Sequence, residues 1–158
     1  QMCIRDRSFR TPLLMRLPGG KKGDIPQLVQ NIDYAPTFLE LAGAPIPADI
    51  QGESLLPLLK GERPENWRNS LYYHYYEYPA EHSVKRHYGV RDDRYKLIHF
   101  YGEKNEHNDA INCNELYDLQ SDPNELNNLY DNPEYADIQT RLQARLDKFR
   151  VDQKVDEY

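Results

Sequence analysis

The sequence has 158 residues, a formal net charge of -6, 39% hydrophobic residues and 13 tyrosines. The net negative charge disfavours duplex nucleic acid as the main partner, because such binding depends on many lysines and arginines that neutralise phosphates. No apolar run approaches the roughly 20 residues that a membrane-spanning helix needs. Cys3 and Cys113 lie far apart in sequence, so the sequence predicts neither a disulfide framework nor a cysteine-based metal site.

The amino-terminal stretch divides into an anomalous segment and a predicted strand. Residues 1–7 carry no periodicity, and the string MCIRDR resembles translated sequencing-adapter sequence, so we treat them as non-native and exclude them from the fold. Ser8–Leu17 is mostly apolar and is ended by a Pro-Gly-Gly turn, which predicts a short strand. Such an apolar strand needs neighbours on both faces, so we expect it to be cut from a larger sheet.

Two short helices are predicted in the first half of the chain. Asp33 is expected to cap a helix over Tyr34–Ala42, because a proline lies in its first turn and Gly43 supplies a left-handed C-terminal cap. Leu55–Leu59 predicts a second short helix, ended by Gly61. Several apolar side chains of this half would then face a missing partner, namely Leu13, Leu14, Phe38 and Leu41.

A change in composition near Trp67 predicts a domain boundary, because aliphatic, helix-forming residues give way to tyrosine-rich segments. Asp92 and Asp93 predict a tight hairpin turn. Gly102–Asn114 is too polar for a core and predicts a loop. The expected strands of a small antiparallel sheet are Leu71–Tyr76, Tyr88–Arg91, Tyr95–Tyr101 and Glu115–Asp118.

The last predicted element is an amphipathic helix. Asn132 is expected to cap it, with Pro133 at the first helical position. Val151–Tyr158 is highly charged and is expected to fray. Residues at helical spacing form one apolar stripe that would cover the sheet, and they are Tyr135, Ile138, Leu142, Leu146 and Phe149.

The connection between the first two predicted strands carries the most functional side chains. It places hydrogen-bonding groups and cationic groups beside aromatic rings, which suits an anionic, ring-shaped ligand such as a sulfated or phosphorylated sugar. The alternative is that the rings are sheet core and the charges a solvated loop. The side chains concerned are Glu81, His82, Lys85, Arg86 and His87.

Five ordered motifs together resemble the C-terminal half of type I sulfatases, from about Ser8 to Arg150. The motifs are SFRTPLL at 8–14, QNIDYAPT with LELAG at 30–43, QGESLLPLL at 51–59, GVR with RYKLI at 89–98, and ELYDL with DPNE at 115–125. The similarity is greatest to bacterial sulfatases that act on sulfated glycans, including N-acetylglucosamine-6-sulfatase-like enzymes. It implies an α/β, alkaline-phosphatase-like fold, of which this chain is the C-terminal portion.

The resemblance also implies a domain organisation. Residues 8–66 would be the tail of the sulfatase α/β domain. Residues 67–158 would be the C-terminal subdomain, a small antiparallel sheet packed by a C-terminal helix. The missing N-terminal catalytic domain would then be the main protein partner.

Sulfatases of this family use a formylglycine, made from Cys or Ser in a C/S-x-P/A-x-R motif, and a Ca²⁺ ion that polarises the sulfate. Neither Cys3, followed by Ile-Arg-Asp-Arg, nor Cys113, between two asparagines, matches that motif. The resemblance therefore implies that the nucleophile and the metal ligands lie upstream. It assigns no catalytic or metal-binding residue to this chain, which would be inactive alone.

What the resemblance implies for this chain is substrate recognition. In the family a loop of the C-terminal subdomain closes over the nucleophile pocket and contacts the sugar, and the matching segment here is 81–88. His82 and His87 are the candidates for hydrogen bonds to sugar hydroxyls, because an imidazole both donates and accepts. Lys85 and Arg86 are the candidates for attracting a sulfated glycan. Relatives are usually exported, which implies a periplasmic or secreted parent.

Two functional hypotheses from different classes follow. In the first, the chain is a C-terminal fragment of a sulfuric ester hydrolase that recognises sulfated carbohydrate. In the second, it is a stand-alone glycan-binding module that uses the tyrosine-rich sheet and the His82–His87 loop. The predicted buried strand at Ser8–Leu17 favours the first, because an independent module would not begin inside a sheet.

Overall fold

The structure is a computed structural model that describes residues 10–78, 84–102 and 111–155. It contains two compact units, a smaller one over Pro12–Asn69 and a larger one over Ser70–Tyr158 together with Gln1–Thr11. Each unit is described by itself. The division after Asn69 lies close to the boundary that the composition predicts near Trp67. No helix in the described ranges is both long enough and apolar enough to cross a bilayer.

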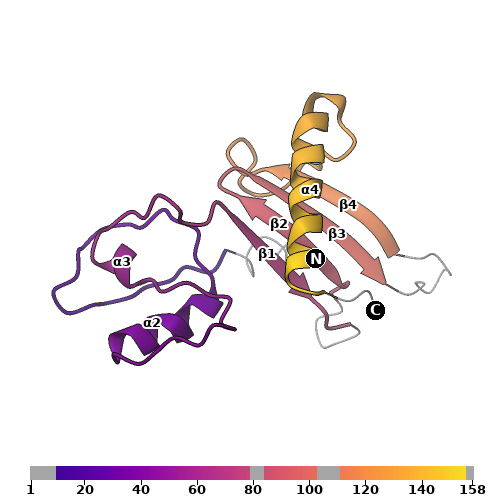
Figure 1. Cartoon of the computed structure of the whole chain (residues 1–158). Helices are drawn as coiled ribbons and strands as arrows, with labels where there is room; N and C mark the ends of the chain where they lie inside the picture. Colours follow the sequence, from indigo (N-terminus) through magenta and orange to yellow (C-terminus); the bar gives the residue numbers. More distant parts are fainter. Residues whose placement is uncertain (1–9, 79–83, 103–110, 156–158) are drawn as a thin grey trace. The chain divides into compact units, whose positions relative to one another are not determined.

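The larger unit is built on an antiparallel sheet with the strand order β1-β2-β3-β4 (Figure 1). The four strands are β1 (Ser70–Tyr75), β2 (His87–Asp92), β3 (Tyr95–Gly102) and β4 (Ile111–Asp118). All four predicted strands are therefore confirmed. The hairpin turn is confirmed as well, since Oδ1 of Asp92 accepts hydrogen bonds from the backbone N–H groups of Arg94 at 2.9 Å and Tyr95 at 2.6 Å.

β4 begins earlier than the sequence predicts. Ile111–Asn114 was expected to belong to a loop, yet these residues pair with β3, where Gly102 lies opposite Ile111 and His99 opposite Asn114. The prediction fails because β4 is the outer strand of the sheet, so its side chains can be polar and exposed while its backbone still pairs on one side. The polarity of these side chains therefore did not show whether the segment is a loop or a strand.

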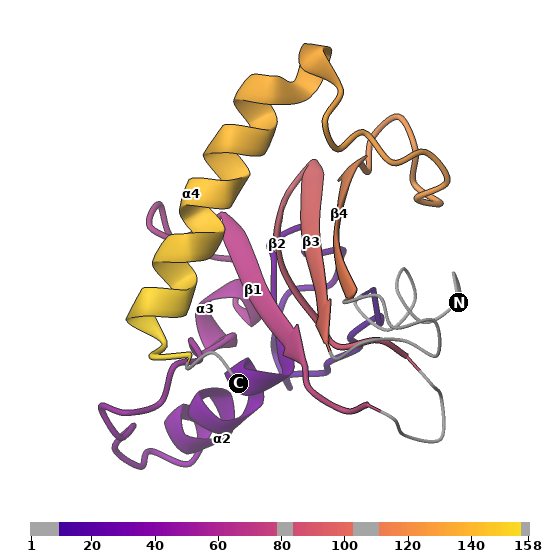
Figure 2. The same ribbon diagram turned by 90° about the vertical axis from the view of Figure 1, so that its right-hand side faces the viewer.

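The helix α4 (Ala136–Asp152) covers one face of the sheet (Figure 2). Its predicted apolar stripe is confirmed: Leu142 and Leu146 are fully buried, and Tyr135, Ile138 and Phe149 pack against the same cluster. Under the helix, the register aligns one residue from each strand in a row across the sheet. That row is Tyr72, Val90, Leu97 and Leu116.

The start of this helix follows the sequence prediction and its end does not. A short helix, η2 (Pro133–Tyr135), precedes α4, and Oδ1 of Asn132 accepts a hydrogen bond from the backbone N–H of Glu134 at 3.0 Å. Fraying was expected from Val151, but the helix continues to Asp152. The reason is that the last turn packs on the sheet, where the Phe149 ring stacks 6.1 Å from that of Tyr72.

An ion pair lies on the sheet face opposite α4. Nζ of Lys96 lies 2.9 Å from both carboxylate oxygens of Glu125, and both side chains are buried. Glu125 has a φ of 55°, in the left-handed region that favours glycine. Glu125 therefore adopts an unfavourable backbone conformation while its carboxylate pairs with Lys96.

The smaller unit contains η1 (Asn31–Asp33), α2 (Tyr34–Leu41) and α3 (Leu56–Leu59). Both predicted helices are confirmed, and Gly43 adopts the expected left-handed conformation with a φ of 68°. The predicted strand Ser8–Leu17 is wrong over its described part, Arg10–Leu17, which is not in a strand. A strand needs a hydrogen-bonded neighbour, and no described segment pairs with this one.

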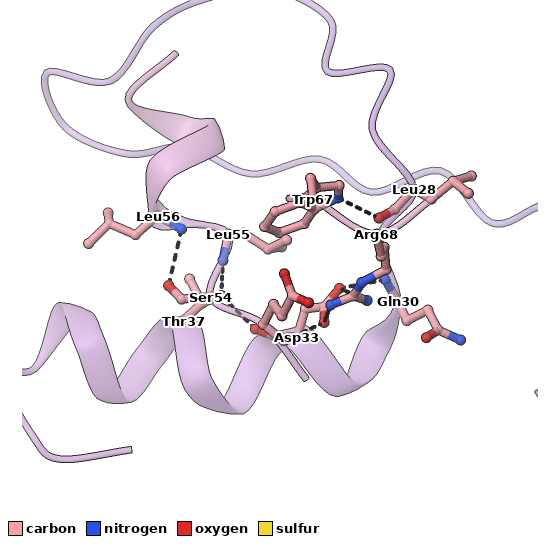
Figure 3. A network of polar contacts seen from close by, with 10 residues as sticks. Leu28, Gln30, Asp33, Thr37, Ser54, Leu55, Leu56, Trp67 and Arg68 are labelled. Atoms are coloured by element: carbon pink, nitrogen blue, oxygen red, sulfur yellow. Dashed lines mark hydrogen bonds and ion pairs between the residues drawn. The ribbon is translucent and has the colours of Figure 1, made fainter. Parts of the chain in front are cut away.

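Asp33 organises this unit (Figure 3). Its carboxylate is completely buried and accepts hydrogen bonds from the backbone N–H groups of Gln30 at 2.7 Å and Glu53 at 2.9 Å. It also binds both terminal nitrogens of Arg68, at 2.7 and 2.9 Å. Asp33 stands at the predicted N-cap position of α2, but its side chain makes no capping hydrogen bond to that helix, because donors from Gln30, Glu53 and Arg68 occupy both oxygens.

Two of the motifs that resemble sulfatases interlock at this point. A Cβ at Gly52 would lie 2.1 Å from the backbone oxygen of Ile32, so only glycine permits this approach. Three residues further on, the backbone N–H of Leu55 donates to the hydroxyl of Thr37 at 2.8 Å. The QNIDYAPT and QGESLLPLL motifs therefore form a single structural unit.

Apolar side chains of the smaller unit are exposed, as the sequence predicts. Leu14 is 94% exposed, Phe38 is 61% exposed and Leu41 is 45% exposed. Solvated surfaces tolerate single exposed apolar residues, but Phe38 and Leu41 lie on one short helix. The unit nevertheless buries four leucines beside its polar network, namely Leu28, Leu55, Leu56 and Leu58.

Candidate functional site

The predicted recognition segment connects β1 to β2. His82 and Glu81 lie outside the described residues. Lys85 and Arg86 precede β2, and His87 is its first residue. The fold therefore places the described part of this segment at the end of the sheet where β1 ends and β2 begins (Figure 1).

Arg86 contacts the backbone of the same connection. Its Nε donates to the carbonyl of Tyr76 at 2.9 Å, and its Nη2 donates to the carbonyl of Tyr78 at 3.2 Å. Its own carbonyl accepts a hydrogen bond from the N–H of Tyr101 at 3.0 Å, next to β2. The side chain thus ties the two ends of the connection together and fixes its width at the sheet.

His87 is buried on the sheet face opposite α4, with an exposed fraction of 2%. Its ring stacks on that of Tyr75 at a centroid distance of 5.4 Å and lies 5.0 Å from Phe100 and 5.9 Å from Tyr73. Nδ1 lies 2.8 Å from the carbonyl oxygen of Lys85. A carbonyl only accepts, so Nδ1 carries the proton and the imidazole holds the entry to β2 in place.

The sheet face that α4 covers carries a second row, made of rings and polar groups, next to the row of core residues. The register aligns His74, Tyr88, His99 and Asn114 across all four strands. Nδ1 of His99 lies 2.7 Å from Oδ1 of Asn114, and the rings of Tyr88 and His99 are 4.9 Å apart. These residues belong to one continuous surface of the sheet.

His74 is held between two tyrosine hydroxyls. Its Nδ1 lies 3.0 Å from the hydroxyl of Tyr72, and its Nε2 lies 2.6 Å from the hydroxyl of Tyr101. Burial, and then the positive charges of Arg150 and His87, lower the pKa of His74 to about 4. The ring is therefore neutral near pH 7 and has one donor and one acceptor, which matches one donating and one accepting hydroxyl.

Tyr76 extends this surface at the exposed end of the sheet. Its ring stacks on His74 at a centroid distance of 3.7 Å and an interplanar angle of 22°. Its exposed fraction is nevertheless 51%. Neither His74 nor His99 is among the site residues that the sequence predicts. The signal that links them is the strand register, since His74 and His99 each lie opposite Tyr88.

The described residues provide no metal site, because they contain no group of three or more His, Cys, Asp or Glu side chains placed to hold a metal ion. Cys113, the described cysteine, is an exposed free thiol in β4. The calcium ion and the formylglycine that the sulfatase resemblance implies therefore do not fit the described side chains.

Comparisons with known proteins agree on one family. A family model described as N-sulphoglucosamine sulphohydrolase, C-terminal, matches residues 2–152. The N-acetylglucosamine-6-O-sulfatase of Bacteroides thetaiotaomicron is 48% identical over 143 residues, which are 88% of this chain and 24% of that protein. This chain thus spans about a quarter of that relative's length.

Solved structures show the same relationship. A protein solved in complex with its substrate, D-glucosamine-2-N,6-O-disulfate, superposes with a TM-score of 0.71 at 48% identity, over 79% of this chain and 24% of that one. A 2-O glycosaminoglycan sulfatase superposes with a TM-score of 0.71 at 31% identity, over 88% of this chain and 29% of that one. The expected fold, the C-terminal portion of the alkaline-phosphatase-like sulfatase architecture, is confirmed, and this chain belongs to the family of sulfatase C-terminal regions.

Proposed function

We propose that this chain is the C-terminal part of a sulfuric ester hydrolase that acts on sulfated glycans, and that it contributes substrate recognition rather than the nucleophile. The observation that carries the proposal is the 48% identity to an N-acetylglucosamine-6-O-sulfatase over 88% of the chain. A structural neighbour with the same identity has a doubly sulfated glucosamine as its substrate. A 6-O-sulfated glucosamine is accordingly the first substrate to test.

The domain organisation is part of this proposal. Residues 8–66 are the tail of the α/β domain, and residues 67–158 are the C-terminal subdomain. The exposed side chains of Leu14 and Phe38 support it, because a catalytic domain packed on the smaller unit would cover them. The share of the relative's length that the chain spans, 24%, leaves room for such a domain.

The cofactors belong to the proposal as well. In the parent protein a formylglycine supplies the nucleophile and a Ca²⁺ ion polarises the sulfate, and both are held by residues upstream of this chain. The chain's own residues are left to bind and orient the sugar.

Within the chain, we propose that the sugar is recognised by the segment that contains His82, Lys85, Arg86 and His87. His82 and Lys85 are proposed to meet the sugar directly. The contacts of the other two support an indirect role, since Arg86 ties Tyr76 and Tyr78 and the His87 ring is buried against Tyr75 and Phe100. They position the segment.

The test measures release of sulfate by the full-length parent from N-acetylglucosamine 6-sulfate and from a 2-O-sulfated hexuronate. Preferential hydrolysis of the 6-sulfate supports the proposal. His82→Ala and His87→Ala are expected to raise KM for the sulfated sugar about tenfold, with calcium binding unchanged. Lys148→Met, an exposed cation on α4, is the control. A parent that releases no sulfate from any sulfated sugar would overturn the assignment.

A further inference from the structure

On the sheet face that α4 covers, the side chains change along the strands from apolar to polar and aromatic. The row Tyr72, Val90, Leu97 and Leu116 is apolar and lies under Leu142 and Leu146 of the helix. The next row is composed of two imidazoles, a phenol ring and an amide, as described above. Beyond it, Tyr101 lies opposite Asn112. We name the surface formed by His74, Tyr76, His99, Tyr101 and Asn114 the ring-and-amide face.

The aromatic part of this face is held rigid. One side of the Tyr76 ring rests on His74, whose two ring nitrogens both engage tyrosine hydroxyls, so the support does not rotate freely. The backbone of Tyr76 is fixed by Arg86. A half-exposed ring that is supported from behind loses little conformational entropy when a ligand stacks on it.

The polar part of the face has both donors and acceptors. Oδ1 of Asn114 only accepts, so Nδ1 of His99 donates to it, which leaves Nε2 as the ring nitrogen that can meet a ligand. The structure gives that nitrogen no hydrogen-bond partner among the described residues. Sugar hydroxyls both donate and accept, so a histidine nitrogen beside amide donors suits them.

The charges around the face favour an anionic ligand. The Arg150 guanidinium lies 4.6 Å above the Tyr88 ring and donates to its hydroxyl at 3.2 Å. Arg86 lies at the same end of the sheet, beside Tyr76. The five residues that define the face include no carboxylate. Two guanidinium groups therefore lie beside the described part of this face, and they would attract a sulfated chain.

We propose that the ring-and-amide face binds a pyranose ring of a sulfated glycan, next to the sugar whose sulfate is cleaved. Tyr76 stacks on the apolar face of that ring, and His99 with Asn114 binds its hydroxyls. This inference rests on the proposed function for the identity of the ligand. It adds a second sugar contact, formed by side chains of β1, β3 and β4 together with Tyr76.

The experiment compares a sulfated trisaccharide with the corresponding sulfated monosaccharide as substrates of the full-length parent. In Tyr76→Ala, the ratio of KM for the trisaccharide to KM for the monosaccharide is expected to rise about 3- to 10-fold. Tyr76→Phe keeps the stacking ring and should keep the ratio. Leu126→Ala, another exposed apolar residue of the same unit, is the matched control.

An unchanged ratio in both Tyr76→Ala and His99→Ala would overturn the inference. So would a fall in the melting temperature of the full-length protein with the ratio unchanged, since that result would make the face a packing surface for the rest of the parent. If the parent hydrolyses no sulfate ester, the proposed function fails by itself. Calorimetric binding of the trisaccharide then decides this inference, which survives only if Tyr76→Ala weakens it.

Discussion

The two units of this chain achieve their structures by different physical means. In the larger unit, the side chains of Val90, Leu97, Leu116, Leu142 and Leu146 are almost completely removed from solvent between a sheet and a helix. In the smaller unit, one buried carboxylate gathers four hydrogen bonds while large apolar side chains remain exposed. The larger unit has one continuous hydrophobic core between a sheet and a helix, whereas the smaller unit combines a polar network with a few buried leucines.

This difference predicts which substitutions destabilise each unit most. Apolar contacts are many and individually weak, so a hydrophobic core loses stability in proportion to the volume removed. A polar network with one central acceptor loses most of its contacts when that acceptor is removed. Substitutions in the two units should therefore act locally and differ in size.

The largest effect is expected for Asp33→Ala. The substitution removes the four hydrogen bonds that the carboxylate accepts and leaves the Arg68 side chain, only 13% exposed, without its counter-charge. Breaking a buried ion pair in this way costs about 3 to 5 kcal/mol. Hydrogen exchange should accelerate over 30–59 and not in β2 and β3, while Glu40→Ala, an exposed acid of α2, should have no effect. Equal acceleration in the sheet would show that the two units unfold together.

Leu142→Ala should have the next largest effect, and this effect should lie in the larger unit. The side chain is completely buried between α4 and the sheet, so its truncation costs about 3 kcal/mol in transfer and cavity terms. Exchange should accelerate in β2 and β3 and remain unchanged in α2. Val151→Ala, which changes an exposed residue of the same helix, is the control. A similar loss in both variants would contradict the assignment of the core.

Asn132→Ala tests the start of the C-terminal helix. It removes the hydrogen bond to the backbone N–H of Glu134, which should cost about 1 kcal/mol. The measurement is the midpoint of urea unfolding followed by circular dichroism. Asn124→Ala, in an exposed turn, should leave that midpoint unchanged. A loss as large as that of Leu142→Ala would mean that the cap also supports the core.

The smallest effect near pH 7 is expected for Arg94→Gln. Oδ2 of Asp118 lies 2.7 Å from the Arg94 guanidinium, whose hydrogen bond lowers the pKa of that carboxyl from 3.8 to about 2. Because the folded-state pKa is depressed, the stabilisation is present above about pH 4 and is lost as the pH falls toward 2. Arg94 is half exposed, so the contribution is screened by solvent.

The measurement is the acid-unfolding midpoint of the larger unit. In Arg94→Gln this midpoint should move to a higher pH, because the Asp118 pKa returns toward its ordinary value. Arg145→Gln, on the helix, is the control for a general loss of positive charge. A midpoint that does not move would show that the ion pair has no part in acid stability.

The sequence predicted one part of the candidate site and missed the other. The segment from His82 to His87 was identified by its side-chain types and by the sulfatase resemblance. The ring-and-amide face was missed, because its members come from β1, β3, β4 and the residue after β1, with up to 40 positions between them. Side-chain type alone did not distinguish His74, held between two hydroxyls, from an ordinary packed histidine.

Local patterns in the sequence determined the strands of the sheet, the turn at Asp92, the cap at Asn132 and the apolar stripe of α4, because each depends on residues only a few positions apart. Long-range pairing decided the rest. Ile111–Asn114 became a strand because β3 offers it a hydrogen-bonded neighbour, and Arg10–Leu17 did not because no described segment does. Asp33 stands at its predicted cap position, but its side chain does not cap α2, because Glu53 and Arg68, distant in sequence, bring donors to its oxygens in the folded chain.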